Sequence, residues 1–361
     1  MNLDLNDDQE MLKASLERLL AERYQPEQRR GYAAQDGGWS RERWADFAEL
    51  GLLALPFGEG DGGLGLGPVE TMIVGEAFGR ALVLEPYLAA IVLAGTAIGC
   101  GGSNEQRAVL LPGLLDGSTL YAYAHDAQVV AEPSGRDWRL SGTISLVIAG
   151  NSADRIVVPT PAGIFIVSAD AISRRGYRLH GGGGAADAVL DRLHVATSDR
   201  LAGDCAPERV IEAGIAFLAA EAAGAMQAAL DITLDHLRTR EQFGRPIGTN
   251  QALRHRAADM LVEVEQARSA AILAALLSGA TDPLERARGF AAVKAVIGAA
   301  ARFVAQQAVQ LHGGIGVSEE HVVSHYFRRL TAIGMLLGDS DHHLDRLAAM
   351  GGFTAGDGEV E

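Results

Sequence analysis

The chain has 361 residues, of which 48% are hydrophobic and 21% charged, so it can bury a large core spread over about two or three domains. Its 31 basic and 46 acidic residues give a formal net charge of −15, which disfavours nucleic acid and anionic membrane surfaces as partners. An anionic small ligand would therefore need a local cluster of hydrogen-bond donors.

Two cysteines, Cys100 and Cys205, are too few for a disulfide scaffold or a multi-cysteine zinc site. Neither lies near a histidine or a basic cluster in the sequence, so we expect both to be buried free thiols. The histidines near the C-terminus show no convincing ligand spacing with acidic residues, and no metal site is predicted. An acidic N-terminal segment without an apolar core predicts no signal peptide. The apolar run 87–100 is too short to span a membrane. We expect a soluble, cytoplasmic protein.

Residues 1–120 are predicted to form a helical domain. Asn6 and Gln9 resemble a capping box ahead of the first helix. Ser40 can cap a later helix that Gly51 ends. The glycine-rich segment FGEGDGGLGLG is predicted to be a flexible connector, and further helical patterns follow it.

Near residue 120 the hydrophobic pattern changes to short, alternating runs such as TISLVIAG and GIFIVSA, which predict an antiparallel β domain over residues 121–202. From residue 203 the chain returns to long Ala-rich helices, one reaching about Arg240, one following Gln251 and one running from about 284 to 310. Residues 203–361 are therefore predicted to form a four-helix bundle. The expected fold class is α+β and mostly α.

The order of these domains, and several motifs within them, resemble the acyl-CoA dehydrogenase family over nearly the whole chain. ELGLLALPFGEGDGGLGLG, EAFGRAL and SNEQRAVLLPGLLDG are similar to segments of the family's first domain, and SGTISLVIAGNSADRIVV is similar to its β domain. The most specific segments are RTREQFGRPIGTNQAL (238–253) and QLHGGIG (310–316). The resemblance implies FAD-dependent α,β-dehydrogenation of an acyl-CoA thioester, in lipid or steroid catabolism. It also implies an oligomer, with electron-transfer flavoprotein as the electron acceptor.

In the family, these two segments reach the FAD of a neighbouring subunit. Arg240 matches an arginine whose guanidinium can fork onto the pyrophosphate. The other positions that the resemblance assigns to this cofactor are Gln242, Phe243, Ile247, Asn250, Gln310, Leu311, Gly313 and Gly314. Read without the family, the same residues could form ordinary helix ends, since a glycine cap and a GRPIG turn both end helices.

The sequence departs from the family where a chain would hold its own flavin. The family's β domain usually begins with a Thr-Glu-Pro segment followed by Gly-Ser-Asp, but here the matching start reads AYAHDAQ (122–128). The segment EPSGRD (132–137) lies too close to the next strand and is predicted to be a hairpin turn. Thr143 occupies a position where the family often has lysine. We therefore expect the loops for this chain's own flavin to be eroded.

No catalytic base is identified from the sequence. Many members carry Glu-Gly-Thr after a late bundle helix, but Leu337 stands at the glutamate position, before Gly338. Other members place the base on the first long bundle helix, where Glu212 and Glu221 are the nearest carboxylates. Glutamates on such a helix more commonly face solvent or a subunit interface than act as a catalytic base.

Three hypotheses follow from this asymmetry. The first is a subunit that completes a flavin site in a paralogous partner, as in heteromeric bacterial acyl-CoA dehydrogenases of the steroid type. The second is a self-sufficient homodimer or tetramer with Glu212 or Glu221 as its base. The third is a flavin-free structural or binding protein on the same scaffold. The sequence does not identify the acyl-CoA.

Overall fold

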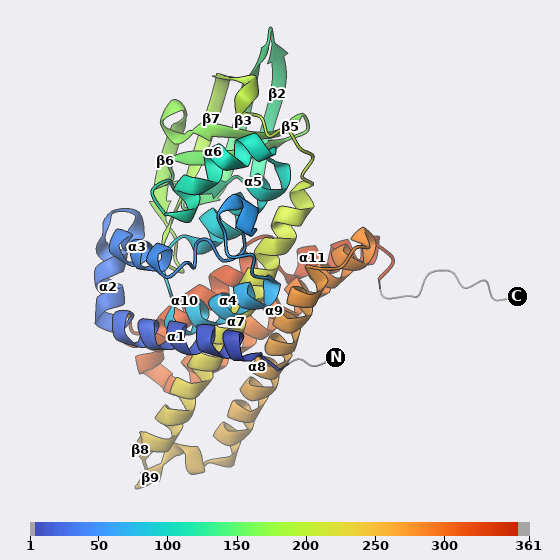
Figure 1. Ribbon diagram of the computed structural model, residues 1–361. Helices are drawn as coiled ribbons and strands as arrows, with labels where there is room; N and C mark the ends of the chain where they lie inside the picture. The colour runs from blue at the N-terminus through green and yellow to red at the C-terminus, as the bar shows by residue number, and fades with distance from the viewer. Residues whose placement is uncertain (1–3, 353–361) are drawn as a thin grey trace, which may run out of the picture. The chain divides into compact units, whose positions relative to one another are not determined.

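The computed structural model describes residues 4–352. Its internal contacts divide the chain into two units, one formed by residues up to 71 together with 83–214, the other by 72–82 together with those from 215 onward. Helices dominate, and a region of β-strands lies in the middle of the chain, as predicted (Figure 1). The N-terminal helices and the strands thus share one unit, while most of the predicted bundle lies in the other.

The predicted helix caps of the first unit are confirmed. Asn6 and Gln9 form a capping box in which each side chain accepts a hydrogen bond from the other's backbone N–H. Ser40 caps its helix by accepting from the N–H of Arg43, and Gly51 follows the helix with a φ of +73°. The helices are α1 (Asp7–Arg23), α2 (Pro26–Ala34), α3 (Arg41–Glu49), the π-helix η3 (Leu88–Ala94), α5 (Gly95–Gly101) and α6 (Asn104–Leu115).

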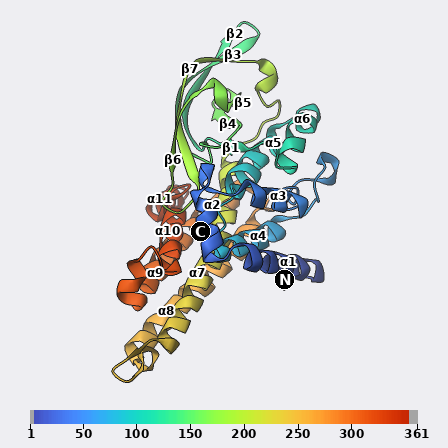
Figure 2. The same ribbon diagram turned by 90° about the vertical axis from the view of Figure 1, so that its left-hand side faces the viewer.

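The β domain of the first unit contains two sheets (Figure 2). Its strands are β1 (Tyr121–Tyr123), β2 (Asp126–Ser134), β3 (Asp137–Ile148), β4 (Arg155–Thr160), β5 (Gly163–Ser168), β6 (Ser173–Arg178) and β7 (Gly184–Val195). One sheet is antiparallel in the order β2-β3-β7-β6, and the other has the order β1-β4-β5. Strand β1 runs parallel to β4. Parallel pairing is possible here because a long connection, which includes β2 and β3, joins the two strands. Alternating side chains, among them Leu140, Ile156 and Phe165, are fully buried in one core.

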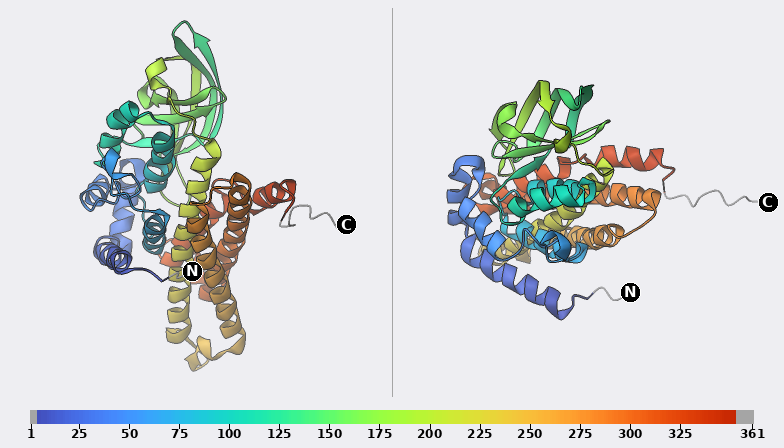
Figure 3. Two further views of the ribbon diagram at one scale, coloured as in Figure 1. Left: turned by 45° about the vertical axis from the view of Figure 1, so that its right-hand side comes forward. Right: turned by 45° about the horizontal axis from the view of Figure 1, so that its top comes forward.

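The second unit is built around long Ala-rich helices, as predicted. Figure 3 shows α7 and α8 joined at one end by the β8–β9 hairpin. Helix α9 packs against α8, α10 and α11. The elements are α7 (Pro207–Thr239), whose first turns belong to the first unit, β8 (Glu241–Gln242), β9 (Arg245–Pro246), α8 (Gln251–Leu277), α9 (Pro283–His312), α10 (Val322–Met335) and α11 (Ser340–Ala349). Short 3-10 helices complete the chain: η1 (Asp36–Gly38), η2 (Glu59–Asp61), η4 (Ala169–Ala171), η5 (Thr197–Asp199), η6 (Ile247–Thr249) and η7 (Gly313–Val317).

Helix α4 (Pro68–Ala81) lies in the second unit from residue 72 onward and packs closely against α7. A Cβ on Gly79 would overlap the backbone carbonyl of Glu221, and a Cβ on Gly224 would overlap the carbonyl of Glu76. Each helix therefore contributes a glycine that allows the other's backbone to approach. Close contact between the helices, rather than a turn conformation, requires glycine at these positions.

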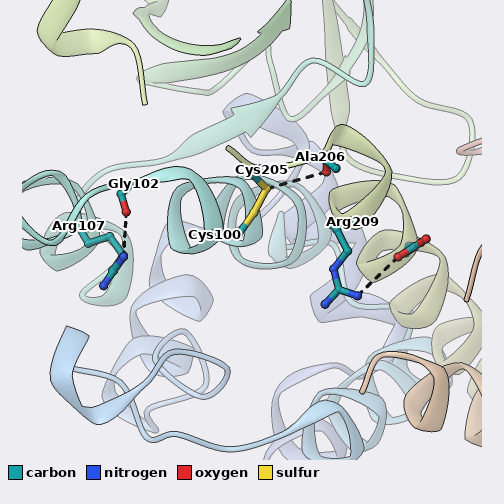
Figure 4. Close-up of a disulfide and its surroundings, with 7 residues drawn as sticks. Cys100, Gly102, Arg107, Cys205, Ala206 and Arg209 are labelled. Atoms are coloured by element: carbon teal, nitrogen blue, oxygen red, sulfur yellow. Dashed lines mark hydrogen bonds and ion pairs between the residues drawn. A yellow bond between two sulfur atoms is a disulfide. The ribbon is translucent and has the colours of Figure 1, made fainter. Parts of the chain in front are cut away.

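The prediction of two free thiols is wrong, because Cys100 and Cys205 form a disulfide with their Cα atoms 5.5 Å apart (Figure 4). Cys100 lies near the end of α5, and Cys205 precedes Pro207, the first residue of α7. The two segments also approach each other at Gly101 and Gly203. The N–H of Gly203 donates to the carbonyl of Gly101 at 2.7 Å. The two cysteines are 105 residues apart in sequence, and local patterns give no signal for such a pair.

Two helical stretches, Pro207–Thr239 and Pro283–Val317, are long and apolar enough to cross a membrane by composition alone. However, 83% and 61% of their most apolar windows are buried within the protein. Both stretches are therefore explained as core helices of the protein.

Candidate functional site

Arg240 is the first residue after α7, at the point where the helix gives way to the β8–β9 hairpin. Its backbone N–H donates to the carbonyl of His236 at 2.9 Å, and its carbonyl accepts from the N–H of Ile247 at 2.8 Å. The side chain is exposed, and among residues 4–352 it has no hydrogen bond or ion pair. An arginine whose backbone is held by hydrogen bonds and whose guanidinium is exposed is suited to bind a pyrophosphate through two parallel hydrogen bonds.

The hairpin beside Arg240 is an element that the sequence did not predict. Gln242 pairs with Arg245, and the turn between them is made by Phe243 and Gly244, with φ values of +53° and +77°. Phe243 is 100% exposed. Phe243 therefore presents an apolar ring to solvent from a left-handed turn position, which is uncommon for a non-glycine residue.

Asn250 has a structural role that the family resemblance did not assign. It is the N-cap of α8, and its Oδ1 accepts from the N–H of Ala252 at 3.2 Å. The preceding 3-10 turn includes Ile247, which is partly buried. The cap fixes where α8 begins, and so it fixes the base of the hairpin.

Residues 236–256 form a basic segment in an acidic chain, with five arginines and a single glutamate. Two of the arginines are occupied within the protein, Arg254 by the carbonyl of Gly248 at 2.7 Å and Arg256 by the side chain of Gln307 at 3.2 Å. The remaining three have exposed side chains with no acidic partner among the described residues: Arg238, Arg240 and Arg245. This segment supplies the local donor cluster that an anionic ligand would need.

The glycine turn after α9 is open to an incoming ligand. Gly313 has a φ of +64°, and a Cβ added there or at Gly314 would meet nothing within 4 Å. Both glycines are exposed, as is Gln310. Leu311, by contrast, is 5% exposed, so its side chain packs into the core and only its backbone is available to a ligand. The turn both ends α9 and leaves accessible backbone.

The fold brings the arginine hairpin and the glycine turn together. The ring of His236, four residues before Arg240, stacks on the ring of His312, the residue before Gly313, with centroids 4.4 Å apart. The helix turn that precedes the exposed Arg240 therefore contacts the residue that precedes the open glycine turn, within one unit. These donors fit the pyrophosphate and adenine half of FAD.

No loop for a flavin ring stands between β1 and β2. Only Ala124 and His125 separate the two strands, so the chain has no room for the family's Thr-Glu-Pro segment there. Tyr123 is 1% exposed, and its buried hydroxyl has no hydrogen-bond partner among residues 4–352. Burial raises the pKa of Tyr123 and lowers the pKa of His125. The start of the domain is therefore closed by packed aromatic side chains.

The segment EPSGRD is a hairpin turn, as predicted. Ser134 at the end of β2 pairs with Asp137 at the start of β3, and Gly135 takes a φ of +69° between them. The turn cannot substitute for the missing loop, because it belongs to the far end of the β2–β3 pair. Thr143 lies within β3, paired with Gln128 on one side.

Leu337 lies in a tightly held segment after α10. It has a φ of +58°, Gly338 follows at +95°, and its side chain is 7% exposed. Buried Lys294 donates from Nζ to the carbonyls of Gly334 and Gly338 at 3.1 and 2.6 Å, and His343 donates from Nε2 to the carbonyl of Leu337 at 2.8 Å. The segment is thus rigid, but it carries an aliphatic side chain that cannot accept a proton.

Glu221 is engaged by Arg329, which donates from Nε and Nη2 to the two carboxylate oxygens at 2.5 and 2.7 Å. Both side chains are largely buried. This bidentate ion pair occupies both oxygens that a base would present. Glu212 lies in the other unit, 8% exposed, with Arg209 at 3.9 Å. Neither carboxylate shows the exposed, convergent geometry of a general base.

Among the described residues, no group of three or more histidine, cysteine, aspartate or glutamate side chains is arranged to hold a metal ion. The histidines near the C-terminal end are used otherwise, as His343 illustrates by binding the carbonyl of Leu337.

Comparison with protein families matches both helical parts of the chain. A model described as acyl-CoA dehydrogenase, N-terminal domain, matches residues 6–118, and one described as acyl-CoA dehydrogenase, C-terminal domain, matches residues 209–351. The two matched segments flank the β domain. The chain is also 30% identical to acyl-CoA dehydrogenase IpdE2 of Mycobacterium tuberculosis, over 94% of this chain and 96% of that protein.

Solved structures of similar fold include two assemblies of paired components. The ChsE4-ChsE5 complex from Mycobacterium tuberculosis matches with a TM-score of 0.90 and 26% identity, covering 97% of this chain and 98% of the matched one. A variant of the Tcur3481-Tcur3483 steroid ACAD matches with a TM-score of 0.87 and 29% identity, covering 95% and 97%.

Proposed function

The chain belongs to the acyl-CoA dehydrogenase family, and we propose that it serves as a subunit that completes an FAD site held by a paralogous partner. Members of the family bind FAD and oxidise a carbon–carbon single bond of an acyl-CoA thioester.

One asymmetry carries the proposal. The surface that reaches toward a neighbouring subunit's cofactor is present, with an exposed Arg240 and an open turn at Gly313 and Gly314. The parts that would serve this chain's own site are missing, since two residues replace the flavin loop and Leu337 replaces the glutamate. A chain with one half of a shared site is useful beside a different chain that supplies the other half.

The similarity to two-component assemblies supports a heteromer over a homo-oligomer. The name of one such neighbour describes it as a steroid ACAD, and that supports a bulky, steroid-like acyl group as the substrate class. Neither neighbour identifies this chain's own partner or substrate. We propose a paralogous dehydrogenase subunit as the partner, electron-transfer flavoprotein as the electron acceptor, and the cytoplasm as the compartment.

In this scheme the chain contributes binding and orientation. The Arg240 guanidinium neutralises the pyrophosphate, Gln242 and Phe243 approach the cofactor from the hairpin, and the backbone around Gly313 lies against it without a Cβ in the way. The chemistry that bound FAD would supply is hydride acceptance from the β-carbon of the thioester. In this proposal the partner supplies the base that removes the α-proton, because neither Glu212 nor Glu221 is placed for that step.

Two other functions are weighed against this one. A self-sufficient homodimer or tetramer would need Glu212 or Glu221 as its base, but the Glu221 carboxylate is paired with Arg329. A flavin-free structural protein on the same scaffold would leave the three exposed arginines of the hairpin region without a role.

The test is co-expression of this chain with paralogues encoded beside it. The purified heteromer should be yellow and should oxidise acyl-CoA, whereas this chain alone should be colourless and inactive. Replacing Arg240 with Gln removes a charge-assisted hydrogen bond and should weaken FAD retention roughly 10- to 100-fold. Arg18→Gln, on the exposed surface of α1, is the matched control for loss of one positive charge.

A yellow, fully active homo-oligomer made from this chain alone would refute the proposal. A heteromer whose FAD affinity is the same with Arg240→Gln as with Arg18→Gln would also contradict it.

A further inference from the structure

Three histidines lie ring to ring beside the candidate cofactor surface. The His236 ring stacks on the His312 ring at 4.4 Å with 26° between the planes, and the His321 ring lies 4.8 Å from that of His312 at 54°. The carbonyl of His236 accepts from the N–H of Arg240, and His312 directly precedes Gly313. The stack therefore joins the arginine hairpin, the glycine turn and the start of α10.

The central ring of this stack fits only when it is neutral. Nδ1 of His312 lies 2.8 Å from the carbonyl oxygen of Ala308, which can only accept, so Nδ1 carries the proton. Nε2 is buried and has no hydrogen-bond partner among residues 4–352, so in the neutral ring it holds a lone pair. Protonation would bury an N–H without an acceptor between two other imidazoles.

The outer rings disfavour protonation for separate reasons. Nδ1 of His321 accepts from the N–H of Val323 at 3.3 Å and caps α10, and a protonated imidazole would lose that acceptor. His236 lies between the positive charge of Arg240, which disfavours a second cation, and the negative charge of Asp235, which favours one. No other charged group acts strongly on the three rings in this part of the structure.

Burial is the largest cause of a lowered pKa at all three histidines, and it lowers the pKa of His312 to about 4 from 6.5. The unfolded chain therefore binds protons that the folded stack does not. Stability from the neutral stack is fully present above pH 6.5 and is lost as pH falls from 6.5 toward 4.

We propose that the neutral stack of His236, His312 and His321 holds the hairpin and the glycine turn in one binding geometry, and that acid releases FAD by protonating it. The inference rests on the proposed function, because it assigns the stack as the positioning element of that shared site. The histidines touch each other and the backbone, so they act on the cofactor through Arg240 and Gly313.

The first measurement uses the purified chain without flavin. Denaturant unfolding at pH 7.5 and 5.5 is compared between the wild type and His312→Asn, whose amide can still donate to the Ala308 carbonyl but cannot titrate. Between these values the wild-type unfolding constant should rise about tenfold more than that of the variant. His180→Asn, an exposed histidine of the first unit, should behave as the wild type.

The second measurement follows FAD release from the heteromer between pH 7.5 and 4, because the pKa of His312 in the folded chain is about 4. Release should accelerate toward pH 4 for the wild type and much less for His312→Asn or for His321→Asn, which keeps a capping acceptor. Equal pH dependence of wild type and His312→Asn in unfolding would overturn the inference, and so would FAD release that ignores pH. The unfolding arm needs no flavin, so its failure is distinct from failure of the proposed function.

Discussion

Reduction of the Cys100–Cys205 disulfide should destabilise the protein measurably. In the loop-closure model a cross-link over the observed 105-residue separation is worth about 4.7 kcal/mol, while natural disulfides typically contribute about 2–4 kcal/mol. For a unit of roughly 200 residues, each 1 kcal/mol shifts Tm by about 2–4 °C, so reduction should lower Tm by roughly 4–16 °C. The backbone hydrogen bond from Gly203 to Gly101 cannot replace a covalent link between segments so far apart in the sequence.

The assay is a thermal unfolding scan of the full chain with and without a thiol reductant. A Cys100→Ser, Cys205→Ser double variant should unfold at the temperature of the reduced wild type and should not respond to reductant. Thiol alkylation of the unfolded protein under non-reducing conditions supplies an independent count of free cysteines. Two reactive thiols in the untreated protein, or a reductant-induced shift equally present in the double variant, would refute the reasoning.

Three further changes test the buried polar groups. Glu221→Gln leaves the Arg329 guanidinium without its counter-charge and should destabilise the chain by about 3–5 kcal/mol in denaturant unfolding, whereas a Glu221→Leu, Arg329→Leu double variant should recover most of that loss. Burial raises the pKa of Glu85 to about 8 from 4.5, so the folded chain keeps a proton that the unfolded chain loses, and stability should fall as pH rises from 4.5 to 8 in the wild type but not in Glu85→Gln. Lys294→Met removes the donor to the Gly338 carbonyl and should lower the free energy of unfolding by roughly 2–4 kcal/mol in denaturant unfolding. The backbone amide of Leu337 should then exchange hydrogen faster. An unchanged exchange rate at Leu337 would contradict the role of Lys294 in holding this segment.

Local sequence signals predicted the elements well where the chain itself carries the cause. Asn6 with Gln9 and Ser40 mark real helix starts because a cap involves residues only three apart. The long Ala-rich helices were found because their apolar stripes repeat over many turns. The turn at 134–137 was found because its glycine lies between two alternating strands.

What the sequence did not reveal depends on residues that are far apart in the chain. The partner of Glu221 is 108 residues away, and the second cysteine is 105 residues away. The three stacked histidines come from different elements, and nothing in their local context relates them. The β8–β9 hairpin was missed for another reason, since Phe243 in a left-handed turn position runs against the usual turn chemistry.

The close packing of α4 against α7 has a consequence for the construction of chimaeras between members of the family. An exchange of residues 203–361 alone would transplant the bundle without 72–82, the strip of chain packed against Gly224. The recipient's own α4 would then have to match a foreign helix at backbone-to-backbone range, where a single extra methyl group overlaps a carbonyl. Exchange of the bundle between members of the family therefore requires that residues 72–82 of α4 be transferred together with the bundle.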